Sequence, residues 1–480
     1  MTEADLVKKL WGFCHLLRHD GISYGEYVEQ LTYLLFLRMA DEHGLGLPEK
    51  TDWRHIKKLS GSALTDEYAE ALRALGKQEG LLGDIFSGAQ SRFRSPVNLK
   101  TLIELIAETD WTTLDVDVKA AAFEGLLEQA ASEGKKGAGQ YFTPRILIQS
   151  IVRVMKPDPR ENGDFTIGDP ACGSGGFLVA AYEWLMKETG GALRRDTAMR
   201  VRTNTYHGQD LVPQPRRLAL MNLYLHGVEP HIKLGDTIYE VLGPERFDVV
   251  LTNPPFGTQG AKQVPEREDF TTRTANKQLN FLQHVLSVLK RGGRAAVVVP
   301  DSVLFEDQAG EVFEILTDEA RLHTIMRLPN GTFTPYSPIR TNVLFFTKGQ
   351  PTKGVWIYDG RTNVQHITKV ERPLTPDYFE EFERCFGDSP DGLSDRTERD
   401  SPDGGWLGGN RWRRYGIEDL RDRQFKVDTI KWLRDEFERD DDALPPPEEL
   451  TTDIVSELQS LADEINSIKT LLEESNQGVR

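Results

Sequence analysis

Residues 165–188 read FTIGDPACGSGGFLVAAYEWLMKE, and this stretch decides the fold. A short apolar run ends at Asp169, a glycine-rich loop follows, and apolar residues recur at helical spacing from Phe177 onward. Gly173, Gly175 and Gly176 allow a ligand to approach the backbone closely and permit dihedral angles forbidden to other residues. A strand, a glycine loop and a helix in this order predict a ligand site at the tip of a strand in a parallel sheet.

The chain on either side of this stretch continues the same pattern. Short apolar runs alternate with helical segments at residues 165–169, 205–210, 231–236, 247–253, 294–300, 323–329 and 342–348. Such alternation indicates βαβ units and a mainly parallel sheet with both faces covered. After about Gly349 the pattern weakens.

Four regions follow from these patterns. Residues 1–133 are rich in helical periodicity and predict a helical domain, and residues 134–375 carry the α/β pattern. We expect residues 376–449 to be an insertion and an acidic linker, irregular with some helix. Residues 450–480 predict a C-terminal helix, because its apolar residues follow a heptad spacing: Ile454, Leu458, Leu461, Ile465, Ile468 and Leu472.

Composition excludes several classes of protein. The 480 residues have a formal net charge of −17, which argues against a protein that grips nucleic acid mainly through its own basic face. No segment has the roughly 20 apolar residues needed to cross a membrane, and the start lacks the pattern of a signal peptide. The three cysteines show no metal-binding or disulfide spacing, so we expect a cytoplasmic protein without a metal.

Four successive strands are predicted to end in a polar residue: Asp169, Asp210, Asp236 and Asn253. Each alone is also explained as a helix N-cap, but together they converge on one edge of the sheet. The loop after Asp169 has neither the GxGxxG nor the Walker spacing, and a carboxylate suits a sulfonium or ammonium ligand better than a pyrophosphate. With Asp210 on ribose hydroxyls and Asp236 on an adenine amine, the set outlines S-adenosylmethionine.

The fourth tip, LTNPPFGT at residues 251–258, predicts the acceptor of the reaction. An amine conjugated to a purine ring is a poor nucleophile because its lone pair is delocalised. The side-chain oxygen of Asn253 and the carbonyl of Pro254 can accept hydrogen bonds from it and push electron density to nitrogen. Phe256 can stack on a base that has left its helix, so positioning and electrostatics carry the acceleration.

At this point the chain shows a family resemblance. DPACGSGGF and NPPF, in this order and about 80 residues apart, resemble the N6-adenine DNA methyltransferases in which the cofactor motif comes first. GQYFTPR, at residues 139–145, is similar to the element that precedes that motif and folds over the methionine part of the cofactor. The helical start resembles the amino-terminal domain of modification (M) subunits of type I restriction-modification systems.

The resemblance implies a Rossmann-like, S-adenosylmethionine-dependent methyltransferase domain, preceded by an α-helical domain and followed by a C-terminal helix. It implies methyl transfer to adenine N6 in DNA, at sites chosen by another subunit. Phe333, in the later segment RLPNGTFTPYSPIRTNVLFFTKG, is a weaker candidate for contact with the target base. The implied catalytic residues are Asn253, Pro254, Pro255 and Phe256. The implied cofactor residues are Gln140, Tyr141, Phe142, Thr143, Asp169, Pro170, Gly173, Ser174, Gly175, Asp210, Asp236 and Thr237.

The resemblance also implies partners. In such systems a specificity (S) subunit reads double-stranded DNA, two M subunits flank this one S subunit, and restriction (R) subunits can join. An acidic M chain is then reasonable, because a partner subunit can supply most of the contacts with DNA. We expect docking on the S subunit through the N-terminal domain and the heptad helix; the alternative is an ordinary amphipathic helix folded back on its own domain.

Several readings stay open at the level of sequence. The NPPF chemistry also suits a stand-alone DNA enzyme or an RNA or protein-glutamine methyltransferase, and a non-catalytic scaffold can keep the same fold. Cys172 is expected to be a small buried residue rather than a reactive thiol, and His226 and His231 show no metal pairing. The polar loop after Phe256 either closes over DNA or is a solvated loop; in the first case its basic residues lie near phosphates, namely Lys262, Arg267, Arg273 and Lys277.

Overall fold

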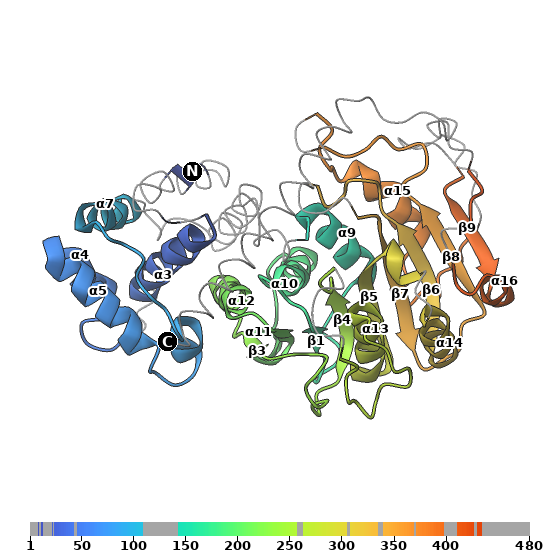
Figure 1. Ribbon diagram of the computed structural model, residues 1–480, viewed down its shortest axis with the longest axis horizontal. Helices are drawn as coiled ribbons and strands as arrows, with labels where there is room; N and C mark the ends of the chain where they lie inside the picture. Colours follow the sequence, from blue (N-terminus) through green and yellow to red (C-terminus); the bar gives the residue numbers. More distant parts are fainter. Residues whose placement is uncertain are drawn as a thin grey trace, which may run out of the picture. The chain divides into compact units, whose positions relative to one another are not determined.

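The fold is built around one sheet in which Asp169 ends one strand and Asn253 directly follows the neighbouring strand. The computed structural model describes residues 8, 11–12, 22, 24–42, 46–108, 143–256, 263–304, 308–334, 339–368, 371–397, 410–426 and 430–433. Nearly all of these belong to one unit, Met1–Trp432 (Figure 1). The predicted C-terminal heptad helix lies outside the described residues, as do Gln140, Tyr141 and Phe142.

The sheet has nine strands in the order β3-β2-β1-β4-β5-β7-β6-β8-β9. They are β1 (Ile167–Asp169), β2 (Tyr206–Asp210), β3 (His231–Leu234), β4 (Phe247–Thr252), β5 (Leu289–Pro300), β6 (Ala320–Arg327), β7 (Thr341–Lys348), β8 (Gly354–Asp359) and β9 (Trp412–Gly416). Neighbouring strands from β3 to β5 run parallel, whereas β7 is antiparallel to β5 and β6, and β9 is antiparallel to β8. The prediction of a mainly parallel α/β sheet is confirmed.

The strand order reverses between β1 and β4, and this position decides where the site lies. Gly168 pairs with Val250 in parallel register, so the ends of β1 and β4 stand side by side. In open parallel sheets, the crevice outside such a reversal point is where ligands bind.

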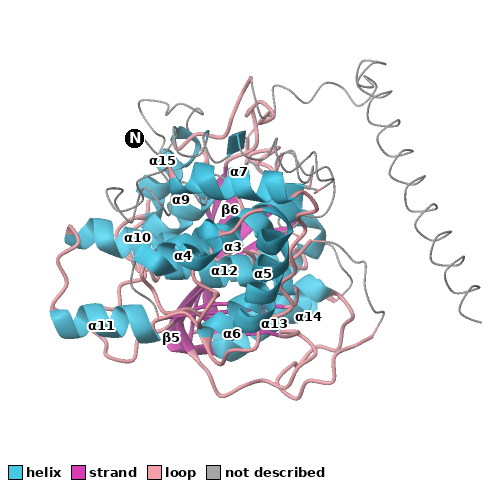
Figure 2. Cartoon of the chain, turned by 90° about the vertical axis from the view of Figure 1, so that its left-hand side faces the viewer, coloured by secondary structure: helices cyan, strands magenta, loops and turns pink. Residues whose placement is uncertain are grey.

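Helices cover both faces of the sheet, because its central strands are apolar on both sides (Figure 2). Val249 and Leu251 belong to one core and Val250 to the other. The first core is closed by α9 (Arg145–Met155), α10 (Gly176–Thr189), α11 (Arg195–Asn204), α12 (Pro213–Leu225) and α15 (Asp377–Phe386). The second is closed by α13 (Lys277–Val288), α14 (Ala309–Glu319) and α16 (Ile417–Asp422), while a short 3-10 turn, η2 (Asp301–Leu304), follows β5.

The N-terminal region is helical, as the sequence predicts. Its described helices are α3 (Tyr24–Glu42), α4 (Trp53–Lys58), α5 (Gly61–Leu75), α6 (Leu81–Phe86) and α7 (Pro96–Ala107). Arg217 of α12 binds this region: its guanidinium donates to the carbonyls of Ile85 (2.7 Å) and Ser87 (2.7 Å) and pairs with Glu29. The helical region is therefore joined to the helix that follows the Asp210 strand tip.

The described residues after residue 375 include two helices and one strand. α15, β9 and α16 all lie there, and β9 extends the sheet beside β8. The described part of the segment near residues 385–410 is anchored by Arg396, whose Nε donates to the carbonyl of Phe386 (2.8 Å) and whose Nη1 donates to the hydroxyl of Thr324 (2.8 Å). Among the described residues, none of the helices is long and apolar enough to cross a membrane.

Candidate active site

Asp169 ends β1 beside the reversal point of the sheet. Its side chain is buried, with 2% of the residue exposed, and Oδ1 accepts a hydrogen bond from the backbone N–H of Ala171 (3.1 Å). The pKa of this carboxyl is raised to about 7, chiefly by burial and to a smaller extent by the nearby charge of Asp210, while the hydrogen bond from the Ala171 N–H acts in the opposite direction. A cationic ligand would therefore find a carboxylate whose charge is only weakly satisfied by the protein.

The glycine loop bends tightly over α12. Gly173 and Gly175 have φ values of 54° and 81°, in the left-handed region that other residues avoid. A Cβ atom on Gly175 would also meet the Cβ of Ala219 in α12 at 3.3 Å. Cys172 within the loop is buried, and burial raises the pKa of its thiol well above the ordinary value, so it is a packing residue and not a thiolate nucleophile.

Asp210 ends β2 and closes the loop from the other side. Its Oδ2 accepts from the N–H of Gly173 (3.0 Å) and its Oδ1 from the N–H of Val212 (2.8 Å). Burial raises the pKa of this carboxyl, while these two N–H groups lower it. A carboxylate has about four acceptor sites, so two remain for a ligand. Leu211, the next residue, is 60% exposed, an apolar surface beside the carboxylate that the sequence analysis missed.

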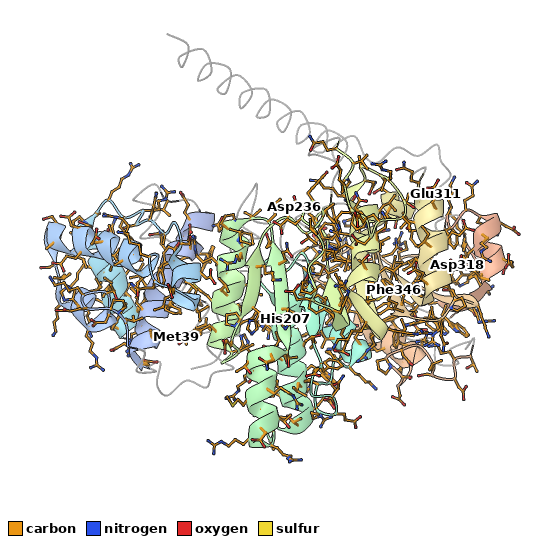
Figure 3. All side chains as sticks on the ribbon, turned by 90° about the horizontal axis from the view of Figure 1, so that it is seen from below. Met39, His207, Asp236, Glu311, Asp318 and Phe346 are labelled. Atoms are coloured by element: carbon orange, nitrogen blue, oxygen red, sulfur yellow. The ribbon has the colours of Figure 1, made fainter. Side chains whose placement is uncertain are left out.

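Asp236 follows β3. It lies at the opposite end of the neighbouring strands β2 and β3 from His207, which is near the start of β2 (Figure 3). Its Oδ1 accepts from the N–H groups of Ile238 (2.9 Å) and Tyr239 (3.1 Å), while Oδ2 receives no hydrogen bond from any described residue. Thr237 beside it donates its hydroxyl to the carbonyl of Pro170 (2.7 Å), which joins this turn to the loop after β1.

Asn253 follows β4 and has one half of its amide in use. Its Nδ2 donates to the hydroxyl of Thr143 (2.9 Å), whereas Oδ1 is buried and has no hydrogen-bond partner among the described residues. A buried acceptor without a donor costs roughly 1–3 kcal/mol. Thr143 belongs to the GQYFTPR element at residues 139–145, which is predicted to contact the cofactor. Its hydrogen bond fixes the direction in which Oδ1 of Asn253 points.

The backbone carbonyls of the two prolines after Asn253 differ in their hydrogen bonding. The Pro255 carbonyl accepts from Nε2 of Gln278 in α13 (3.1 Å), whereas within the described residues no donor reaches the carbonyl of Pro254. Phe256 meets Phe333 edge to face, with ring centroids 5.4 Å apart and an angle of 82° between the rings. The structure thus brings Phe333 together with the NPPF segment.

A charged cluster anchors the start of α9, next to Thr143. The Nη2 group of Arg145 donates to both carboxylate oxygens of Glu183 in α10 (2.9 and 3.2 Å), and Nε2 of His226 lies 3.4 Å from the same carboxylate. Burial opposes the charge on Glu183, but His226 and Arg145 together lower its pKa. Sequence analysis missed this cluster, because the three residues come from three separate helices or their ends.

The expectation that the basic residues after Phe256 lie near phosphates or in a solvated loop is wrong for Arg267. Only 8% of Arg267 is exposed, and its guanidinium lies over the ring of Phe270 at 4.4 Å. It binds Asp269 with two hydrogen bonds of 2.7 Å. Lys262 lies outside the described residues, and Arg273 is exposed.

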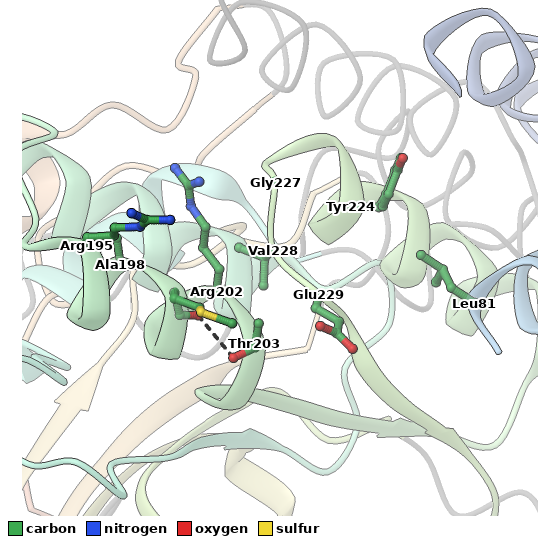
Figure 4. A pocket seen from close by; sticks show the side chains of 10 residues that line it. Leu81, Arg195, Ala198, Arg202, Thr203, Tyr224, Gly227, Val228 and Glu229 are labelled. Atoms are coloured by element: carbon green, nitrogen blue, oxygen red, sulfur yellow. Dashed lines mark hydrogen bonds between the residues drawn. The ribbon is translucent and has the colours of Figure 1, made fainter. Parts of the chain in front are cut away.

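A cavity of about 570 Å³ lies elsewhere, between α11 and the segment after α12 (Figure 4). Its lining includes Arg195, Arg202, Tyr224 and Val228. Thr203 and Glu229 in its wall lie a few residues before β2 and β3, so the cavity is near the starts of these strands and not near the strand tips. The described residues hold no cluster of three metal-ligating side chains.

Comparison with known families covers nearly the whole chain. Residues 114–432 match the family described as N-6 DNA Methylase, and residues 6–45 match the HsdM N-terminal domain. The methylase subunit of the type I restriction enzyme EcoKI from Escherichia coli strain K12 is 37% identical, with 98% of this chain and 95% of that protein aligned. The StySPI methylase subunit from Salmonella potsdam is also 37% identical, with all of both chains aligned.

Solved structures of type I restriction-modification proteins agree with these sequence matches. The crystal structure of the EcoKI M protein matches with a TM-score of 0.54 at 34% identity, covering 98% of this chain and 96% of that one. A second solved structure, described as showing the structural basis underlying complex assembly and conformational transition of the type I R-M system, matches with a TM-score of 0.72 at 27% identity. The match covers 99% of both chains.

Proposed function

The chain belongs to the N-6 DNA methylase family, as a methylase subunit of a type I restriction-modification enzyme that methylates adenine N6 in DNA, and we propose that its methyl donor is S-adenosyl-L-methionine, bound at the tips of β1, β2 and β3. When bound, this donor supplies a methyl group on a positively charged sulfonium.

The acidic strand tips fit such a donor. Asp169 presents a buried carboxylate to a positive group, and Asp210 keeps two acceptor sites for ribose hydroxyls. Asp236 has its Oδ2 free for an adenine amine, and the exposed Leu211 provides an apolar surface for the adenine ring. The open backbone of the loop from Pro170 to Gly175 completes the cradle, with Thr237 holding Pro170 in place.

The observation that carries the catalytic proposal is the unpaired, buried Oδ1 of Asn253 beside the unused carbonyl of Pro254. Two acceptors on adjacent residues match in number the two hydrogens of an exocyclic amine. Hydrogen bonds from the amine to these acceptors favour a pyramidal nitrogen and return its lone pair from the ring. This is catalysis by positioning and by preorganised dipoles.

The aromatic residues hold the target base in this proposal. Phe256 and Phe333 contact each other edge to face, with ring centroids 5.4 Å apart. In this proposal a base extruded from the duplex stacks on Phe256, and Phe333, which packs against that ring, is the second candidate for contact with the base. Thr143, with Gln140, Tyr141 and Phe142 before it, is assigned to the methionine side of the donor.

The partners are proposed from the relatives. A net charge of −17 argues against a grip on double-stranded DNA mainly through this chain's own basic face, so we assign the reading of sequence to a specificity subunit. Two copies of this chain flank one specificity subunit in this assembly, and restriction subunits can join as further members. Residues 450–480, outside the described part, and the N-terminal domain are the proposed docking elements.

Labelled methyl transfer tests the proposal. The reconstituted complex is incubated with DNA and S-adenosyl-L-methionine that carries a labelled methyl group, and the DNA is digested to nucleosides. We expect the label in N6-methyl-2′-deoxyadenosine only. Label in a cytosine derivative, in RNA or in protein would contradict it.

A further inference from the structure

The turn that carries Asp236 is fixed by its own backbone. The N–H groups of Ile238 and Tyr239 bind Oδ1 of Asp236 at 2.9 and 3.1 Å, and the N–H of Asp236 donates to Oε1 of Glu240 at 2.9 Å. The direction of the free Oδ2 atom therefore depends on where the peptide groups of residues 237–240 lie. A group that fixes these peptide groups therefore also fixes the direction of the Asp236 carboxylate.

Arg267 holds them. Its Nη1 donates to the carbonyl of Thr237 (2.9 Å) and to that of Glu240 (3.2 Å), with the carbonyl of Ile238 at 3.5 Å. These carbonyls belong to the same turn whose N–H groups bind Asp236. The guanidinium reaches them from a position 27 to 30 residues further along the chain, after the NPPF segment.

The Nε and Nη2 groups of the Arg267 guanidinium also have hydrogen-bond acceptors. Nε and Nη2 bind the two carboxylate oxygens of Asp269, each at 2.7 Å, and Nη2 lies 3.2 Å from Nδ1 of His284. Burial lowers the pKa of His284 to about 3, so its ring is neutral and Nδ1 can accept. All five N–H groups of Arg267 thus have an acceptor in a fixed planar arrangement, which a lysine ammonium cannot reproduce.

We propose that Arg267 is a positioning residue of the methyl-donor site, which clamps the turn at residues 237–240 and so aims Oδ2 of Asp236 at the adenine amine of the donor. This inference rests on the role given to Asp236 in the proposed function. It predicts that Arg267 controls how well the site distinguishes a purine with the amine from one without it, although the side chain itself touches no part of the ligand.

The test compares two ligands on the full-length methylase complex by calorimetry. One is S-adenosyl-L-homocysteine; the other is its analogue with hydrogen in place of the N6 amine. For the unaltered protein we expect the ratio of their dissociation constants to be about 10 or more, as for loss of a hydrogen bond to a charged group. Arg267→Lys should reduce this ratio to near 1, and Arg273→Lys, an exposed position in the same loop, should leave it unchanged.

Two further variants keep the outcome decisive. Asp269→Asn keeps the guanidinium but removes the charge of its carboxylate partner, so it should lower the ratio even if Arg267→Lys does not fold. In an Asp236→Asn background, Arg267→Lys should lower the ratio no further.

The results separate the inference from its premise. A ratio near 1 in the unaltered protein would refute the role of Asp236 itself. A high ratio that survives in Arg267→Lys and in Asp269→Asn, or equal weakening of both ligands, would overturn the role of Arg267 alone.

Discussion

At the scale of single residues, Asn253 stands out because half of its amide is bonded and the other half is buried without a donor among the described residues. Folded proteins rarely leave a buried acceptor unsatisfied, since the cost is roughly 1–3 kcal/mol. Such a cost is tolerated where a substrate later supplies the missing donor. In the proposed function the Thr143 hydroxyl positions Asn253, because it binds Nδ2 and leaves Oδ1 without a donor among the described residues.

Asp169 gives a prediction about pH at this scale. A positively charged donor binds the carboxylate and not the neutral acid, and the pKa of this carboxyl in the folded protein is raised to about 7 by burial. The affinity for S-adenosyl-L-methionine should therefore rise about tenfold between pH 6 and pH 8 and then level off. Calorimetry across this range checks it, and Asp169→Asn should remove the pH dependence. An affinity that is flat with pH in the unaltered protein would contradict the assignment.

The same carboxyl affects stability with the opposite sign. Because its pKa is higher in the folded chain than in the unfolded chain, the folded state holds the proton more strongly, and its contribution to the free energy of unfolding falls as pH rises from about 4 to about 7.

The residue scale also shows what sequence can miss. The carboxylates at 169, 210 and 236 are evident in the sequence because each follows an apolar run, and the structure places all three after strands of one sheet. The burial of Arg267 is not evident, because a polar loop displays its charges but not their partners. That burial depends on carbonyls near residue 240 and on His284 in α13, contacts that no local pattern encodes.

At the scale of elements, the loop between β1 and α10 is shaped by its contact with α12. Gly175→Ala should destabilise the protein by about 1–2 kcal/mol, because an alanine is strained at a φ of 81°, and should weaken binding of S-adenosyl-L-homocysteine, because the new methyl group presses on Ala219. Thermal unfolding and calorimetry measure the two effects.

Gly191→Ala is the matched control for this prediction. Gly191 has a φ of 75°, and a Cβ atom there meets nothing within 4 Å. We expect a similar loss of stability with unchanged ligand binding. Equal effects of both substitutions on binding would show that backbone strain, and not the contact with α12, governs the loop.

Elements also differ in how far sequence predicts them. The seven strands from β1 to β7 are predictable because they are short runs between helical segments or turns, and the apolar runs β1, β6 and β7 are also buried on both faces. The sequence pattern misses β8 and β9. β9 reads WRRYG and pairs antiparallel with β8 at the edge of the sheet, where three of its five residues are polar or glycine and only the partner strand supplies the pairing.

At the scale of the whole molecule, the family, the fold and the order of the motifs agree. The match to the N-6 DNA methylase family over residues 114–432 confirms the resemblance carried by DPACGSGGF and NPPF. The alternatives of an RNA or protein-glutamine enzyme came from the motif alone, since NPPF does not distinguish between planar nitrogen nucleophiles. The flanking regions settle that choice through relatives aligned over the full length.

Assembly gives the prediction that belongs to this scale. Deleting residues 450–480 should prevent assembly with a specificity subunit, because the acidic, proline-rich segment before them suits a tether and their heptad spacing suits a helical partner. Gel filtration with light scattering measures the complex, and circular dichroism checks that the truncated chain stays folded. Assembly that persists without these residues would refute their docking role.

The central claim is that Oδ1 of Asn253 and the carbonyl of Pro254 accept the adenine amine, and the most direct test is single-turnover methyl transfer by the reconstituted complex with Asn253→Ala. We predict that the rate of transfer to DNA falls by a factor of about 100 or more, while the dissociation constant for S-adenosyl-L-homocysteine stays within about twofold, a difference too small to reflect a lost hydrogen bond. A rate close to that of the unaltered complex, or a parallel loss of cofactor binding, would contradict the claim.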